Sequence, residues 1–188
     1  MNRLFALVAV TAFALTMFVD ARAFGGEEDS RASADSSRSF VFACDPENDL
    51  YKSLVAGGES PRRFDSAEEA IGAAAPKSAV LILADGYPEE RTAIDPELFA
   101  EAKRKELQLY IEYPAAIPGI AFAEPRGVRW ERAVVASDEP SLGLPRMHLL
   151  AMHDCQFLPT EADRPSLVMA RVAGFDTAVF GLPKESFP

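Results

Sequence analysis

Apolar runs alternate with amphipathic segments along the first half of the chain. A strand with one solvent-facing side alternates apolar and polar residues, so unbroken apolar runs predict strands that are covered on both faces. Other segments carry apolar residues at helical spacing. The predicted strands are 39–45, 62–64, 78–86 and 107–114, and the predicted helices are 48–56, 66–75 and one that begins at Asp95. This alternation predicts a parallel sheet with helices on both faces.

Capping residues mark the ends of these helices. Gly57-Gly58 ends the first helix, because glycine adopts the backbone conformation that terminates a helix. Ser66 and Glu69 have the spacing of a capping box, and Asp95 precedes Pro96 at the start of the third helix. The charged residues of the third helix are predicted to face solvent. They are Glu101, Lys103, Arg104 and Lys105.

The second half of the chain has a different character. Segments 131–137, 147–158 and 166–181 are strand-like, and no clear helices separate them. The last segment contains Ala173-Gly174 between two apolar runs, which is compatible with a hairpin. These strands are predicted to lie at one side of the first sheet. The predicted fold class is α/β, a flavodoxin-like three-layer sandwich with a mostly parallel central sheet and additional mixed or antiparallel strands in the C-terminal half.

The N-terminus has the pattern of a signal peptide over residues 1–23. Arg3 precedes an apolar run over 4–19, and Ala21-Arg22-Ala23 fits a cleavage site. The alternative is an uncleaved anchor, but the run is shorter than the roughly 20 residues of a spanning helix. We therefore expect an exported protein without a stable membrane span after cleavage. Segment 24–38 is small and polar and is predicted to be a flexible linker to a domain over 39–188.

Composition narrows the range of partners. The chain has 188 residues, of which 48% are hydrophobic, enough for one domain with a substantial core. The formal net charge is −10. A nucleic-acid-binding surface is basic, so this charge argues against nucleic acid, and it also argues against docking on anionic lipid. Cys44 and Cys155 are the only cysteines, and whether they pair is left open.

Polar residues follow four of the predicted strands. Ligands of open parallel sheets bind beyond the carboxyl ends of the strands, so these residues are candidates for a site. Carboxylates accept hydrogen bonds from sugar hydroxyls, and aromatic rings stack on the C–H faces of sugars, which suits carbohydrate. The candidate ligand-binding residues are Asp45, Asp85, Gly86, Tyr87, Glu112, Tyr113, His153 and Asp154.

The sequence is compatible with several roles for these residues. Asp-Pro and Asp-Gly are ordinary turn sequences, so Asp45 and Asp85 can serve only to end strands. Glu112 lies inside an apolar run, where a carboxylate requires a partner. A hydrolase would use Asp85 and Glu112, with His153 as a third candidate, and a His153–Cys155 nucleophilic pair is a further alternative. The chain lacks a G-x-S-x-G elbow, a Walker loop and zinc-ligand spacing, so no metal or cofactor is predicted.

The order of these elements resembles class I glutamine amidotransferase-like domains, including the ThuA-like group. "VLILADGYP" resembles the strand and glycine-containing loop that helps to form the oxyanion hole in this family, and "LYIEYPAA" occupies the place of its nucleophile elbow. The resemblance covers about 39–158. The elbow of catalytic members is G-x-C-x-G, whereas this chain has Ile111-Glu112-Tyr113-Pro114, with neither the cysteine nor the glycines.

The resemblance therefore implies the fold without the amidotransferase activity. Related non-catalytic domains accompany exported carbohydrate-processing enzymes, so the resemblance implies a carbohydrate-associated module. Its expected partners are a carbohydrate or a downstream catalytic domain, because "GLPKESFP" reads as an abrupt end. The alternatives are a carboxylate-dependent hydrolase acting on glycans and a structural scaffold.

Overall fold

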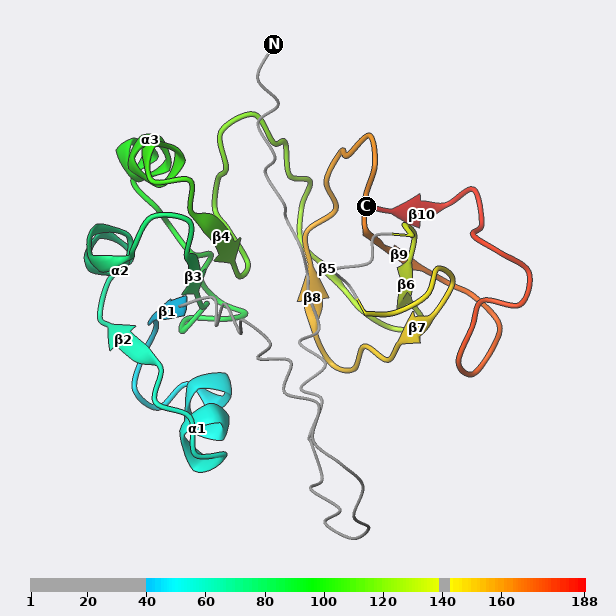
Figure 1. The fold of residues 1–188 in the computed structure, drawn as a ribbon. Helices are drawn as coiled ribbons and strands as arrows, with labels where there is room; N and C mark the ends of the chain where they lie inside the picture. The colour runs from blue at the N-terminus through cyan, green and yellow to red at the C-terminus, as the bar shows by residue number, and fades with distance from the viewer. Residues whose placement is uncertain (1–39, 139–142) are drawn as a thin grey trace, which may run out of the picture.

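The computed structural model describes residues 40–138 and 143–188 (Figure 1). All residues before the first strand lie outside the described residues, including the predicted signal peptide, 1–23, and the predicted linker, 24–38. In Figure 1 the helices and the first strands form one side of the molecule, and the later strands form the other.

The first half forms a four-stranded sheet in which every neighbouring pair is parallel. Its strand order is β2-β1-β3-β4. The strands are β1 (Phe40–Ala43), β2 (Arg62–Phe64), β3 (Ala79–Ile82) and β4 (Gln108–Ile111). The predicted parallel sheet of an α/β fold is therefore confirmed.

Three helices connect these strands. They are α1 (Asp49–Ala56), α2 (Ala67–Ala73) and α3 (Pro96–Arg104). The side chains of Asn48, Ser66 and Asp95 each accept a hydrogen bond from a backbone N–H in the first turn of the helix that follows. The predicted caps at Ser66 and Asp95 are thus confirmed, but the Glu69 carboxylate accepts the Asp65 N–H at 3.3 Å instead of the Ser66 N–H that would complete the capping box.

Both faces of the parallel sheet are covered, because successive side chains of a strand point to opposite faces. Val41 and Val80 pack in one cluster with Ile71 of α2 and Ala102 of α3. Phe42, Cys44 and Leu83 form a second cluster, against which Tyr51 and Leu54 of α1 pack. This arrangement explains why the strand sequences are apolar at consecutive positions.

Lys105 is a correction to the predicted solvent-facing charges of α3. Its Nζ donates to the carbonyl oxygens of Ile71 at 2.8 Å and Gly72 at 2.7 Å, and it pairs with Glu101 at 3.3 Å. The last carbonyls of α2 have no partners within the helix, and a lysine satisfies them well. Helical spacing could not reveal this contact, because it joins segments more than thirty residues apart.

The second half forms separate antiparallel pairings. One sheet has the order β10-β9-β6-β7, and β5 pairs with β8. The strands are β5 (Arg126–Gly127), β6 (Arg132–Val135), β7 (Leu149–Leu150), β8 (Gln156–Phe157), β9 (Leu167–Ala170) and β10 (Ser186–Phe187). Antiparallel strands were expected here and are confirmed; among the described residues they form sheets of their own and do not extend the parallel sheet. The chain leaves β4 through Tyr113, which has a φ of 46°, and Pro114, which lacks a backbone donor.

Two predicted strands are much shorter than their apolar runs. Segment 147–158 contains only β7 and β8, and Asp154 between them has a φ of 49°. Segment 166–181 contains β9 but no hairpin partner. Gly174 has a φ of 139°, and the Val179 N–H donates to the Ala173 carbonyl oxygen, so the chain closes a loop instead of forming a second strand.

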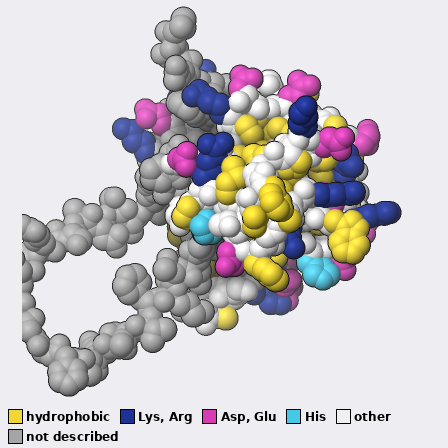
Figure 2. Space-filling model, turned by 90° about the vertical axis from the view of Figure 1, so that its right-hand side faces the viewer, with side chains coloured by type: hydrophobic (Ala, Val, Ile, Leu, Met, Phe, Trp, Pro, Cys, Tyr) yellow, Lys and Arg dark blue, Asp and Glu magenta, His cyan; other side chains and the backbone are white. Residues whose placement is uncertain are grey.

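Large exposed hydrophobic side chains gather on the second half. The most exposed are Trp130, Phe175, Val179 and Phe180. Figure 2 views the molecule from the side of β6, β7, β9 and β10, and hydrophobic side chains occupy the middle of that face, with charged side chains around them. This face points away from the parallel sheet and is not part of the candidate site described below.

Candidate functional site

The carboxyl ends of β1 and β3 meet at the point where the strand order reverses. From β1 the chain continues to β2 on one side, and from β3 it continues to β4 on the other. Ligands of open α/β sheets bind at such a switch point. Asp45 follows β1 and Asp85 follows β3, so the structure brings these two candidates together at this place.

A hydrogen-bond network joins the loops after β1 and β3. The Asp45 N–H donates to Asp85 Oδ2 at 2.6 Å, and Asn48 Nδ2 donates to Asp85 Oδ1 at 3.3 Å. The carboxylate of Asp45 accepts the Glu47 N–H at 2.7 Å. Both aspartates remain exposed to solvent. They therefore order the loops and still present oxygen atoms at the surface.

Cys44 lies beneath this network as the residue that follows β1. Its side chain is buried, and burial together with the charge of Asp85 raises the pKa of the Cys44 thiol to about 11. A reactive cysteine has a lowered pKa, since the thiolate is the nucleophile. Cys44 is therefore a packing residue of the sheet.

Glu112 has the partner that its position in an apolar run requires. Its Oε2 accepts the Ala84 N–H at 3.0 Å, and its own N–H donates to the Ile82 carbonyl oxygen at 2.9 Å. The carboxylate thus connects the end of β4 to the loop that carries Asp85 and Gly86. It replaces a backbone partner that β4 no longer supplies at this point.

Gly86 is constrained by its own loop. A Cβ atom at this position would lie 2.9 Å from the Cβ of Glu90, closer than real side chains approach. The next peptide bond, Tyr87–Pro88, is cis. The approach of Glu90 to Gly86 leaves no room for a side chain at position 86, so this part of the "ADGYP" loop is compact.

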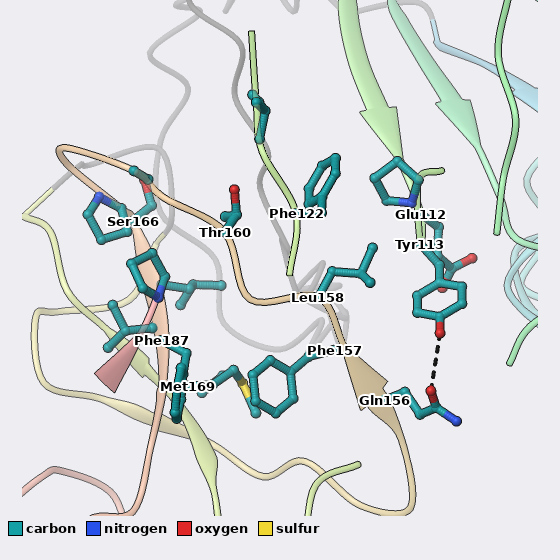
Figure 3. Close-up of a pocket in the computed structure, with 18 of the residues that line it drawn as sticks. Glu112, Tyr113, Phe122, Gln156, Phe157, Leu158, Thr160, Ser166, Met169 and Phe187 are labelled. Atoms are coloured by element: carbon teal, nitrogen blue, oxygen red, sulfur yellow. Dashed lines mark hydrogen bonds between the residues drawn. The ribbon is translucent and has the colours of Figure 1, made fainter. Parts of the chain in front are cut away.

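Tyr87 and Tyr113 connect the two halves of the chain. Their rings pack edge to face, with centroids 5.0 Å apart. The Tyr113 hydroxyl donates to Gln156 Oε1 at 3.1 Å (Figure 3), and the Tyr87 hydroxyl accepts the Gln156 N–H. Gln156 belongs to β8, so both tyrosines hold this strand against the edge of the parallel sheet. Sequence analysis missed Gln156. It is a single amide residue among the apolar residues at the end of 147–158, and this position was the feature that could have identified it.

Removing the Tyr87 hydroxyl should loosen this junction. We expect Tyr87→Phe to lower the free energy of unfolding by about 1 kcal/mol, because the Gln156 N–H loses its partner. Urea unfolding measures the change. Tyr51→Phe is the matched control, since no hydrogen bond to the Tyr51 hydroxyl occurs among the described residues and its ring packs on Phe42. Equal effects of the two substitutions would contradict the assigned role of Tyr87.

His153 and Asp154 lie on the exposed connection between β7 and β8. Among the described residues, no hydrogen bond or ion pair joins the His153 side chain to Asp85 or Glu112. A His153–Cys155 nucleophilic pair would place both residues on one face of a strand, but β7 ends at Leu150. Burial raises the pKa of the Cys155 thiol, which does not favour a nucleophile. Cys44 and Cys155 are both free thiols.

A cavity of about 390 Å³ lies between the end of β4 and the strands of the second half. Figure 3 shows apolar side chains from both halves around it, with Phe122 and Leu158 nearest to Tyr113 and Phe157 near Phe187. The lining residues that matter below are Tyr113, Phe122, Phe157, Leu158, Met169 and Phe187. The cavity is therefore a mainly apolar space next to the carboxyl edge of the sheet.

Two further observations concern the parts of the chain that the structure describes. They contain no group of three or more histidine, cysteine, aspartate or glutamate side chains arranged to hold a metal ion. None of their helices combines the length and the apolar character needed to cross a membrane.

Comparisons with models of protein families, with curated proteins and with solved structures find no match to this chain. The resemblance to amidotransferase-like domains is therefore carried by the sequence motifs alone and remains a prediction.

Proposed function

We propose that the chain is an exported, non-catalytic, amidotransferase-like module that binds carbohydrate at the carboxyl edge of its parallel sheet. The order β2-β1-β3-β4 is that of the first strands of flavodoxin-like sheets, which supports a flavodoxin-like three-layer sandwich. A catalytic domain that acts on the same polymer is the proposed partner.

The observation that carries this proposal is the state of the carboxylates and thiols at the edge. Asp85 and Glu112 each accept a backbone N–H from a neighbouring segment, so both carboxylates stabilise the fold of this edge. Cys44 has a raised pKa and is buried, so it supplies no thiolate. Glutamine hydrolysis needs an activated nucleophile, and none of these groups meets that requirement.

The polar groups of this edge are exposed to solvent, which favours ligand binding over catalysis as its function. Asp45 and Asp85 present carboxylate oxygens at the switch point, and Tyr87 adds a partly exposed ring next to them. Gln156 connects Tyr87 to the exposed His153-Asp154 segment. Sugar hydroxyls donate to carboxylates, and aromatic rings pack on sugar C–H faces, so this combination suits a saccharide.

The alternative of a carboxylate-dependent hydrolase is less well supported. Such an enzyme needs both carboxyl groups on opposite sides of one scissile bond. Glu112 lines the cavity and its carboxylate is turned toward Ala84, whereas Asp85 lies at the switch point beside Asp45. Each carboxylate thus already accepts a backbone hydrogen bond that holds two segments of this edge together.

A titration with defined saccharides tests the proposal. Isothermal calorimetry of the mature chain with neutral oligosaccharides is expected to give saturable binding in the micromolar to millimolar range. Asp154→Asn and His153→Ala should weaken binding at least threefold without changing stability, because neither side chain makes a described hydrogen bond. Glu124→Gln, an exposed carboxylate outside this edge, is the control. Absence of binding across glucans, galactans, mannans and xylans would contradict the proposal.

A further inference from the structure

The cavity beside the carboxyl edge is lined mainly by apolar side chains, whereas the edge itself carries exposed carboxylates. We propose that the cavity accepts an apolar group attached to the sugar, so that an alkyl, acyl or aryl glycoside binds more tightly than a bare saccharide. The inference rests on the proposed carbohydrate-binding function and names the class of ligand for it.

The interior of the cavity is built from apolar side chains. Figure 3 shows Phe122 and Leu158 facing the space from one side and Phe157, Met169 and Phe187 from the other. Phe157 and Phe187 pack at a centroid distance of 5.9 Å, so the two rings form a continuous wall. A wall of this kind stabilises an apolar group by removing it from water.

Three polar side chains that line the cavity, those of Glu112, Tyr113 and Thr160, already have partners. The Tyr113 hydroxyl donates to Gln156, and Thr160 Oγ1 donates to the Ala121 carbonyl oxygen at 2.8 Å. Glu112 accepts the Ala84 N–H, and in Figure 3 its carboxylate lies beside the Tyr113 ring, away from Phe122 and Leu158. A sugar placed inside would leave several hydroxyls without partners, which costs about 1–3 kcal/mol for each buried group.

The sugar itself is better placed at the edge, where solvent and exposed carboxylates satisfy its hydroxyls. Tyr87 and Gln156 link the two regions, since both line the cavity and both adjoin the loops at the edge. The other charged residues at the cavity, Glu161 and Arg164, are exposed to solvent, so they do not place a charge against an apolar group inside.

A homologous ligand series tests the inference. The mature chain is titrated with methyl, butyl and hexyl β-glucosides and β-galactosides below their micelle concentrations, and with hexanol as the sugar-free probe. Burying a methylene group is expected to raise affinity about fourfold. We therefore expect the affinity to rise steeply from methyl to hexyl glycoside. Phe157→Ala should reduce the ratio of hexyl to methyl glycoside affinity at least tenfold.

The controls separate this inference from the function on which it rests. Phe175→Ala alters a side chain that is 96% exposed and does not line the cavity, so it should leave the series unchanged. Phe122→Ala provides a second cavity variant if Phe157→Ala does not fold. Equal affinity for methyl and hexyl glycosides would overturn the inference and leave carbohydrate binding intact. Equal affinity for hexanol and hexyl glycosides would overturn the proposed carbohydrate function.

Discussion

Replacing Glu131 with alanine should lower the free energy of unfolding by about 3 kcal/mol, the largest effect we expect from a polar residue. The Glu131 side chain is only 6% exposed. Its Oε2 accepts the N–H groups of Arg129 at 2.9 Å and Trp130 at 3.0 Å, and its Oε1 accepts Arg171 Nε at 2.8 Å. Alanine leaves these donors without their acceptor at the point where β6 begins and β9 ends.

The same contacts make the stability of the protein depend on pH. The Arg129 N–H, with those of Trp130 and the Arg171 side chain, lowers the pKa of Glu131 to about 2 from its ordinary value of 4.5. The folded state therefore holds the proton less tightly than the unfolded state. The stabilisation is complete above about pH 4.5 and is lost as the pH falls toward 2.

Urea unfolding between pH 7 and pH 2.5 measures both effects. The difference in stability between the native chain and Glu131→Gln should shrink as the pH falls below 4.5, since the unfolded native chain then binds a proton at Glu131 that the folded chain does not. Glu124→Gln, an exposed carboxylate with no described partner, should leave stability within 0.5 kcal/mol. A Glu131 variant as stable as this control at pH 7 would contradict the assigned network.

Lys105→Met is expected to cost about 2–3 kcal/mol of stability, because hydrogen bonds to a charged group are strong and the end of α2 loses its cation. The Lys105 side chain is 13% exposed, and its Nζ lies within hydrogen-bond distance of Ile71 and Gly72. Methionine retains the apolar part of the side chain, so the measured change reports on the ammonium group.

Lys103→Met is the matched control for Lys105. Lys103 lies on the last turn of the same helix, is exposed and has no described ion pair, so its replacement should change stability by less than 0.5 kcal/mol. Thermal and urea unfolding of the two variants give the comparison. Similar losses for both would assign the effect to general charge on α3, and the contact with α2 would then have no special role.

Sequence patterns predicted the first half of the fold well because its signals are local. Continuous apolar runs identified β1, β3 and β4, and Ser66 and Asp95 identified helix starts by their own side-chain chemistry. The second half was harder. Its apolar runs contain residues with positive φ, namely Asp154 and Gly174, at which the extended backbone ends. The apolar pattern of the sequence does not show where such a residue will end a strand.

Only part of the candidate site could be predicted from the sequence. Parallel strands bring their carboxyl ends together, so Asp45 and Asp85 were found from topology alone. The partners of Glu112 and the contact of Tyr87 with Gln156 depend on loops and on packing between the two halves. Such contacts join residues distant in sequence, and no local pattern encodes them.

The most direct test of the central claim is a map of the binding site by two-dimensional NMR during titration with hexyl β-glucoside. The account predicts saturable shift changes in the amides of Asp85, Tyr87 and Gln156 at the edge, with changes in the methyl signals of Leu158 and Met169 in the cavity. Methyl β-glucoside should shift the edge amides and leave the cavity methyl groups nearly unchanged. Shift changes confined to exposed residues that do not line the cavity, such as Trp130 and Phe175, or none at saturating ligand, would contradict it.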